Sequence, residues 1–165
     1  CAHEHLPEYG INDPEVAAAL DASPEDLVVF SGYPGEIVRA PLIDAGLQLL
    51  HMHTGSLPEY RGSTTLYYAL LNDDDITVTA LILNAGIDTG EVVFKKTFPR
   101  PATGTDLDCH LDPIIRADTL RDVAELYVKG QMTTSSQATR GRTYFVIHPL
   151  LRAIAARKLQ DGKTS

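Results

Sequence analysis

The chain has 165 residues, of which 44% are hydrophobic, and it carries a formal net charge of −8. This length supports one core of ordinary size and is too short for two typical domains, so we expect a single domain over residues 1–165. The acidic balance argues against a nucleic-acid partner, because proteins that bind nucleic acids usually present a basic surface. No apolar run approaches the roughly 20 residues that cross a bilayer, and no signal segment opens the chain, which indicates a soluble protein without a membrane partner.

The two cysteines, Cys1 and Cys109, lie far apart and lack the spacing of a disulfide framework or a zinc knuckle. A cytoplasmic location fits this pattern. The chain begins with Cys and without a helical or strand pattern, which is typical of a fragment or a processed form. We interpret the early pair His3 and His5 as a solvated terminus in preference to half of a metal site.

The first half of the chain alternates helical and strand-like patterns, as α/β proteins do. Asp13 followed by Pro14 predicts the start of one helix, and Gly46 the end of another. We expect helices over 15–20, about 41–45 and 63–71, and strands over 27–30 and 47–52.

The second half begins with two segments rich in β-branched and aromatic residues, 76–83 and 91–98, which we expect to pair as neighbouring strands. Thr105 or Asp106 begins a long helical region, and Pro113 predicts a bend or break in it. A polar loop over 130–141, a short strand over 143–147 and an amphipathic helix over 149–159 complete the chain. These patterns predict an α/β fold with an open, mainly parallel sheet, a core over 27–98 and a helical C-terminal extension over 105–165.

Candidate catalytic residues lie where two predicted strands end. His51 and His53 project from the same face of their strand, and Asp88 follows the strand 76–83. Open α/β sheets bind ligands at such strand ends. A carboxylate beside an imidazole fixes its tautomer and raises its pKa, which gives a proton carrier and a cation able to stabilise an oxyanion. The spacing alone is equally compatible with two polar histidines near a loop and an aspartate in a turn.

A resemblance to a known family adds to this pattern. The run from His53 to Gly62, followed by Gly86-Ile87-Asp88-Thr89-Gly90, resembles the folate-dependent formyltransferases, which include glycinamide ribonucleotide, methionyl-tRNA and sugar N-formyltransferases. The family pattern is Asn-x-His, then Leu-Pro and Arg-Gly, then a Leu-Asp-x-Gly turn. Residues 28–33 are similar to the family strand and loop that cover the pterin. The resemblance spans about 27–98 and implies a Rossmann-like open sheet of the formyltransferase type.

The resemblance implies an enzyme of one-carbon metabolism that passes a formyl group from 10-formyltetrahydrofolate to the amine of a sugar or other small metabolite. Protonated His53 would stabilise the oxyanion, Asp88 would hold His53 and receive a proton through water, and Arg61 would hold the loop. No metal is implied. Two loops would wall the pterin: Tyr33, Pro34, Gly35 and Ile37 from one, and Ala85, Gly86, Ile87 and Thr89 from the other.

The sequence departs from the family in two ways. His51 replaces the Asn that donates to the formyl oxygen; a neutral histidine of the right tautomer or a charged one can donate, but two cationic imidazoles would lower each other's pKa. A nucleotide-binding-like half, on the order of 60 residues, has no counterpart before Leu27. The chain is therefore expected to be N-terminally truncated, with sheet edges covered by a missing segment or by another chain, as in a homo-oligomer.

Three alternatives share these residues. A formyl-folate hydrolase would use water as the acceptor. A folate-binding pseudoenzyme would keep the pocket without the chemistry. A metal-dependent hydrolase would use His51, His53 and Asp88 as three ligands and leave one position open.

Overall fold

The computed structural model describes residues 10–32, 36–44 and 46–161. Its strands are β1 (Leu27–Phe30), β2 (Gln48–His53), β3 (Tyr60–Gly62), β4 (Ile76–Ile82), β5 (Val92–Phe98) and β6 (Arg142–Tyr144). Its helices are α1 (Pro14–Asp21), α2 (Ala40–Ile43), α3 (Thr65–Leu71), α4 (Asp112–Val128) and α5 (Pro149–Asp161), with a π-helical turn, Leu107–Leu111, before α4. The helical region begins at Asp106, whose side chain accepts from the amides of Asp108 and Cys109, and changes geometry beside Pro113, as the sequence predicts.

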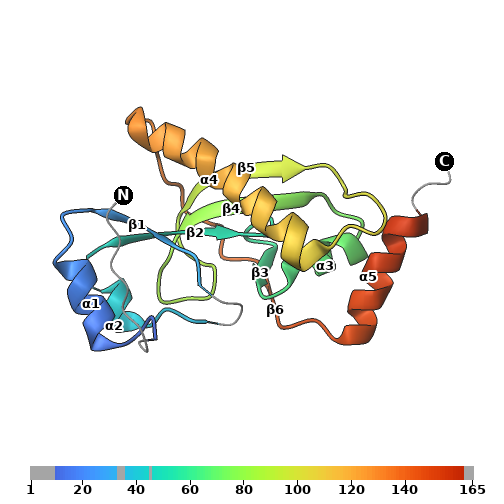
Figure 1. Cartoon of the computed structure of the whole chain (residues 1–165), viewed down its shortest axis with the longest axis horizontal. Coiled ribbons are helices and arrows are strands. Elements are labelled where there is room, and N and C mark those ends of the chain that lie inside the picture. Colours follow the sequence, from blue (N-terminus) through green and yellow to red (C-terminus); the bar gives the residue numbers. More distant parts are fainter. Residues whose placement is uncertain (1–9, 33–35, 45, 162–165) are drawn as a thin grey trace.

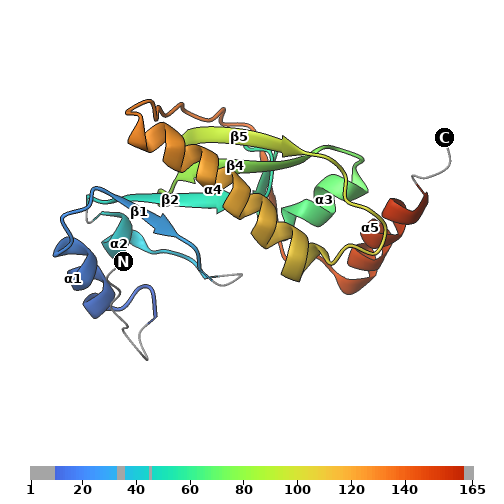
Figure 2. The ribbon, with the colours of Figure 1, turned by 45° about the horizontal axis from the view of Figure 1, so that its top comes forward.

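A four-stranded sheet of order β1-β2-β4-β5 forms the centre of the molecule, and α4 runs across one face of it (Figure 1). The other face carries α1 and α2 beside β1 and β2, as the turned view shows (Figure 2). This arrangement confirms the predicted α/β class and the open sheet.

The pairing within this sheet is mixed. Strands β1 and β2 are parallel, as expected, whereas β4 pairs antiparallel with both β2 and β5. The expectation of mainly parallel pairing does not hold for β4 and β5. Strand β5 runs antiparallel to β4 because only nine residues, 83–91, join them. A parallel crossover needs a dozen residues or more.

The hydrophobic core lies between the sheet and the helices α3, α4 and α5. Leu50 and Met52 of β2 and Val78 and Ala80 of β4 point to this side, each at most 4% exposed. The same cluster includes residues from α3, α4 and the C-terminal arm: Leu66, Leu70, Ile115, Val123, Ile147, Ala155 and Leu159. The C-terminal residues therefore belong to the same hydrophobic core as the residues of β2 and β4.

A second, two-stranded sheet joins β3 to β6 in parallel. At the end of β3, Gly62 has φ +97°, and a Cβ there would lie 2.1 Å from the Tyr144 carbonyl oxygen, so a glycine permits this close pairing. The pairing ties the segment after His53 to the C-terminal arm. Within the part of the chain that the structure describes, no helix combines the length and apolar character needed to cross a membrane.

Candidate active site

Strand β2 places His51 and His53 on the sheet face opposite α4. Their neighbours Leu50 and Met52 fill the core on the α4 side, so alternation along the strand sends both imidazoles to the other face. His51 lies between Phe30 of β1 and Leu81 of β4, and His53 lies opposite Thr79. The predicted common face is confirmed.

The ring of His53 is 6% exposed and is fixed by a main-chain carbonyl. Its Nε2 lies 2.6 Å from the carbonyl oxygen of Tyr60. A carbonyl only accepts hydrogen bonds, so Nε2 carries a proton and donates it there. Gly55 makes room for this contact, because a Cβ on residue 55 would lie 2.6 Å from Nε2 and 2.7 Å from the Tyr60 oxygen.

Asp88 faces the other nitrogen of this ring. Its Oδ2 lies 3.5 Å from Nδ1 of His53 and accepts a hydrogen bond from the Gly62 amide at 2.7 Å. The backbone of Asp88 has φ +50°, in the left-handed region that aspartate tolerates better than most residues. The carboxylate therefore has a fixed position, and the 3.5 Å distance is longer than a normal hydrogen bond, so Nδ1 and Oδ2 are in contact without a well-formed hydrogen bond between them.

The loop after His53 is held in place by Thr79 of β4, whose side chain is fully buried. Its hydroxyl donates to the Gly55 carbonyl at 2.6 Å and accepts from the Leu57 amide at 3.3 Å. Thr54 donates to Asp112 at the start of α4 at 2.5 Å. These bonds anchor both ends of the short loop that carries Gly55.

His51 is partly buried, and its Nδ1 lies 3.2 Å from the Phe30 carbonyl oxygen. Burial lowers the pKa of His51 to about 4; Arg116 and His53 lower it further, and the Phe30 carbonyl and Asp88 oppose the shift. The ring is therefore neutral at pH 7. Because its proton is on Nδ1, Nε2 offers a lone pair and has no proton to donate.

The structure brings the three predicted catalytic residues together. One ring nitrogen each from His51 and His53 and one carboxylate oxygen of Asp88 lie within 4.8 Å of one another. Strand ends far apart in the sequence thus supply two imidazoles and one carboxylate to one small volume.

Gln137 supports the site, although its segment, 130–141, has only the composition of a polar loop. Its side-chain amide donates to the carbonyls of Asp88 at 2.9 Å and Gly90 at 2.7 Å. Arg61 in turn donates to Gln137 Oε1 and to the Ala138 carbonyl, both at 3.1 Å, so it holds the loop as predicted. A glutamine in a Ser/Thr-rich segment carries no local signal for such a role.

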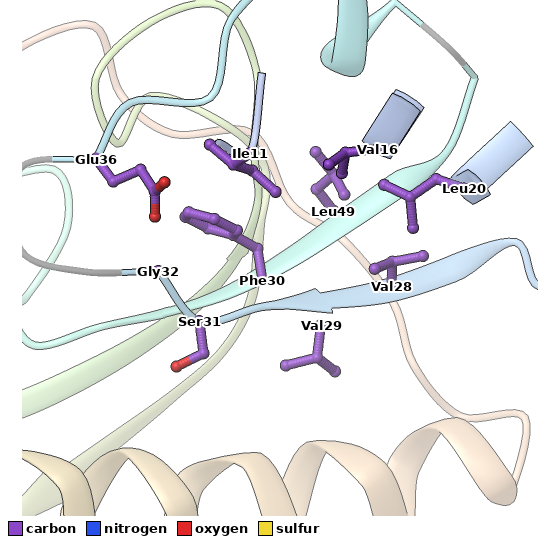
Figure 3. A pocket seen from close by; sticks show the side chains of 10 residues that line it. All are labelled: Ile11, Val16, Leu20, Val28, Val29, Phe30, Ser31, Gly32, Glu36 and Leu49. Carbon is purple, nitrogen blue, oxygen red and sulfur yellow. The ribbon is translucent and has the colours of Figure 1, made fainter. Parts of the chain in front are cut away.

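A cavity of about 560 Å³ adjoins His51 on the same face of the sheet. Figure 3 shows the Phe30 and Val28 side chains pointing toward Ile11 and the helix α1, and the Phe30 ring centroid lies 5.6 Å from that of His51. The lining is mostly apolar, with polar groups near Gly32: Ile11, Val16, Leu20, Val28, Val29, Phe30, Ser31, Gly32, Glu36 and Leu49. The contribution of α1 and Ile11 was not predicted.

The predicted pterin-binding residues have varied surroundings. Tyr33, Pro34 and Gly35 lie outside the described residues. Ile37 and Ile87 are 62% and 48% exposed, and Ala85 is also exposed. The turn that carries the second group is closed by Asn84, whose side chain accepts from the Gly86 amide at 3.0 Å and from the Thr89 hydroxyl at 2.8 Å.

A buried His-Asp pair beyond the ends of neighbouring strands of an open α/β sheet is the arrangement expected of a folate-dependent formyltransferase. The family model described as "Formyl transferase" matches residues 1–108, which is more than half of the chain. The chain therefore belongs to the formyl transferase family.

Curated relatives in this family include two methionyl-tRNA formyltransferases. The protein from Desulfotalea psychrophila is 30% identical over 132 residues, covering 76% of this chain and 41% of the relative. The protein from Synechococcus sp. (strain JA-3-3Ab) is 31% identical over 142 residues, covering 85% of this chain and 43% of the relative. The chain thus spans about two fifths of the length of these curated relatives.

Solved structures with the same fold include two formyltransferases. A sugar N-formyltransferase from Shewanella sp. matches with a TM-score of 0.69 at 19% identity, covering 92% of this chain and 66% of that chain. The formyltransferase PseJ from Anoxybacillus kamchatkensis matches with a TM-score of 0.65 at 16% identity, covering 95% of this chain and 82% of that chain. These matches agree with a Rossmann-like sheet of the formyltransferase type.

Proposed function

We propose that this chain transfers a formyl group from 10-formyltetrahydrofolate to an amine. The observation that carries the proposal is the buried, fixed pair of His53 and Asp88. Membership of the formyl transferase family supports it. Structural neighbours also support the co-substrate: PseJ was solved with tetrahydrofolate, and WlaRD, a sugar 3N-formyl transferase, with 5-N-formyl-THF.

In the proposed reaction, the amine nitrogen attacks the formyl carbon and a C–N bond forms. The developing oxyanion takes a hydrogen bond from Nδ1–H of protonated His53, whose orientation is set by the Tyr60 carbonyl. Asp88 beside Nδ1 holds the ring in place and accepts the proton that the amine loses, through one water. The bond from the formyl carbon to N10 then breaks, N10 takes up the proton that Asp88 received from the amine, and tetrahydrofolate and a formamide leave.

The proposed role of His51 follows from its tautomer. Donation to the formyl oxygen would need an N–H on the free side of the ring, but the ring uses its single proton on the Phe30 carbonyl. We therefore assign Nε2 of His51 as an acceptor that orients the attacking amine by accepting a hydrogen bond from one of its N–H groups. This arrangement gives His51 a catalytic part different from that of the family's asparagine.

The pterin of the co-substrate is proposed to enter the cavity between α1 and β1. A volume of about 560 Å³ lies within the roughly 300–1,000 Å³ of small-molecule sites. Gly32 and Glu36 line the cavity, and the resemblance assigns the residues between them in the sequence, Tyr33, Pro34 and Gly35, together with Ile37, to one wall of the pterin site. Ala85, Gly86, Ile87 and Thr89, on the turn that carries Asp88, would supply the opposite wall.

The acceptor is proposed to be a small amine, such as that of an amino sugar. The net charge of −8 and the sugar N-formyltransferase neighbours support it, whereas the curated relatives are named for methionyl-tRNA. We also propose a role in one-carbon metabolism and a cytoplasmic location. A partner, either a second copy of the chain or a segment of about 60 residues, would cover the edge at β1.

The test is tetrahydrofolate release from 10-formyltetrahydrofolate with nucleotide-linked amino sugars, with methionyl-tRNA and with no amine, followed by mass spectrometry of the product. His53→Asn and Asp88→Asn should each lower the rate by about 10²- to 10⁴-fold, while His110→Asn, at an exposed position, should not. If only methionyl-tRNA is formylated, the acceptor is a tRNA and not a small amine. Release of tetrahydrofolate without any amine would indicate a hydrolase. Equal rates for wild type and His53→Asn would overturn the mechanism.

A further inference from the structure

Both histidines of the site share one feature of hydrogen bonding. His51 uses Nδ1 on the Phe30 carbonyl, and His53 uses Nε2 on the Tyr60 carbonyl. Histidines that ligate metals almost always donate their second ring N–H to a carbonyl or a carboxylate, which fixes the tautomer and the orientation of the ring. Each ring here already has that partner, supplied by the main chain.

The remaining nitrogens, Nε2 of His51 and Nδ1 of His53, are the ones left to bind a ligand. When His53 is neutral, the lone pair of Nδ1 lies 3.5 Å from Oδ2 of Asp88, so a lone pair faces a negative charge. The carboxylate is held there by the Gly62 amide at 2.7 Å. This unfavourable approach is relieved by a cation placed between the groups, either a proton on His53 or a metal ion.

The donor set selects the class of metal. Two imidazole nitrogens and one carboxylate oxygen, each within 4.8 Å of the other two, match the three-ligand sets of open zinc sites and of related divalent first-row ions. His51 is the decisive residue, because the family's asparagine would leave only one imidazole and one carboxylate.

We propose that His51, His53 and Asp88 bind one divalent first-row transition-metal ion, of which Zn²⁺ is the representative. The ion is held by one nitrogen of each ring and one oxygen of the carboxylate, and a further coordination position stays open to solvent or substrate. This site does not depend on folate binding or on formyl transfer.

One consequence does rest on the proposed function. A zinc ion bound to Nδ1 of His53 prevents protonation of this nitrogen, and the proposed formyl transfer requires Nδ1 to carry a proton. Bound zinc should therefore inhibit formyl transfer reversibly, and chelation should restore it.

Binding is tested with Co²⁺ as a spectroscopic probe and Zn²⁺ as a competitor, on the full 165-residue chain carrying Cys1→Ser, His3→Ala and His5→Ala. These substitutions remove the other metal ligands at the N-terminus. We expect one Co²⁺ per chain, visible ligand-field absorption, and loss of this absorption when one equivalent of Zn²⁺ is added. In this background, His51→Asn should weaken binding by about 100-fold or more, since losing only an outer partner costs about 10- to 100-fold. His110→Ala, an exposed histidine outside the site, serves as the matched control.

Either of two results of the cobalt experiment would overturn the proposed metal site. Absence of Co²⁺ binding by the background protein, or equal affinity in His51→Asn, rules it out, with circular dichroism confirming that each variant is folded. The inhibition is measured separately, as the loss of formyl transfer with one equivalent of Zn²⁺ and its recovery with EDTA. If no acceptor is found and no transfer occurs, the proposed function fails, and the cobalt experiment still decides the metal site.

Discussion

His51 shows how main-chain groups decide the chemistry of a side chain. The sequence places an imidazole where the family pattern has asparagine, and either nitrogen of that imidazole is available in principle. The Phe30 carbonyl at 3.2 Å selects the tautomer with the proton on Nδ1. Its second ring nitrogen, Nε2, is thereby left as an acceptor without a proton to donate.

This role makes a prediction for turnover. His51→Ala should lower kcat by about 10²-fold or more, because an acceptor for the amine is lost, whereas His51→Asn should retain much of the activity, because the amide oxygen can accept and asparagine is the family residue. The measurement is tetrahydrofolate release at saturating amine in the presence of EDTA. An alanine variant as fast as wild type would show that His51 takes no catalytic part.

The convergence of His51, His53 and Asp88 was predicted from motif spacing and from the rule that ligands bind at strand ends. Their protonation pattern was not predictable, because it depends on the carbonyls of Phe30 and Tyr60. A main-chain carbonyl is present at every residue and leaves no trace in the sequence. Only the register of β1 against β2, and the path of the loop to Tyr60, determine which carbonyl meets which ring.

Among the elements, the segment 130–141 contributes more than its composition suggests. Gln137 bridges Arg61 to the turn of Asp88, so it fixes the turn that carries the carboxylate of the His-Asp pair. Gln137→Ala leaves the partly buried carbonyls of Asp88 and Gly90 without this donor, which we expect to cost about 1–3 kcal/mol of stability.

Gln137→Ala should also lower kcat by about tenfold or more, because a displacement of a catalytic group by 1 Å can lower the rate by about 10²-fold. Chemical denaturation and steady-state kinetics measure the two effects. Gln131→Ala, at an exposed position on the same segment, is the matched control and should change neither quantity.

The contact between β5 and α4 predicts that the stability of the fold depends on pH. Lys96 lies 2.6 Å from Asp118 and 2.5 Å from Asp122, and its hydrogen bond, followed by that of Arg121, lowers the pKa of Asp122 below its usual value. A carboxyl group whose pKa is lowered by folding stabilises the fold above about pH 4, its unfolded value, and this contribution is lost as the pH falls through the folded pKa.

Asp122→Asn should therefore reduce stability at pH 7 and show a smaller further loss between pH 5 and 3 than wild type. Thermal unfolding followed by circular dichroism across this range checks the expectation. Glu125→Gln, which removes an exposed ion pair with Lys129 on the same helix, is the comparison. A wild-type curve parallel to that of Asp122→Asn would contradict the assignment.

The bounds of most elements follow from sequence periodicity, but the direction of β4 and β5 did not. Alternation of apolar residues is the same in parallel and antiparallel strands, so the pattern alone leaves direction open. For β5 relative to β4, the length of the connection, 83–91, contains the missing information, because it is too short for a crossover. The 22 residues 54–75 between β2 and β4 are long enough for either direction.

At the scale of the whole molecule, the core connects segments that the sequence analysis separates into a core and an extension. Leu70 of α3 is fully buried in a cluster that also holds Ala155 and Leu159 of α5. These contacts join residues about 85 positions apart in the chain, which local patterns do not reveal.

One core implies one cooperative unfolding transition. Leu70→Ala should lower the free energy of unfolding by about 2–5 kcal/mol, the usual cost of such a truncation in a core. Leu150→Ala, at 63% exposure on α5, should change it by no more than about 0.5 kcal/mol. Far-UV circular dichroism and tyrosine fluorescence should give coincident transitions, whereas two separate midpoints would indicate that the C-terminal arm unfolds alone.

The short contact between His53 Nε2 and the Tyr60 carbonyl also has a spectroscopic meaning. A ring proton held at an N···O distance of 2.6 Å in a side chain only 6% exposed exchanges slowly with the solvent. Such a proton gives its own resonance, far downfield of the amide region in a proton NMR spectrum. Since the ring that carries it also faces Asp88, this single line reports on folate, proton and metal at the site without any label being introduced.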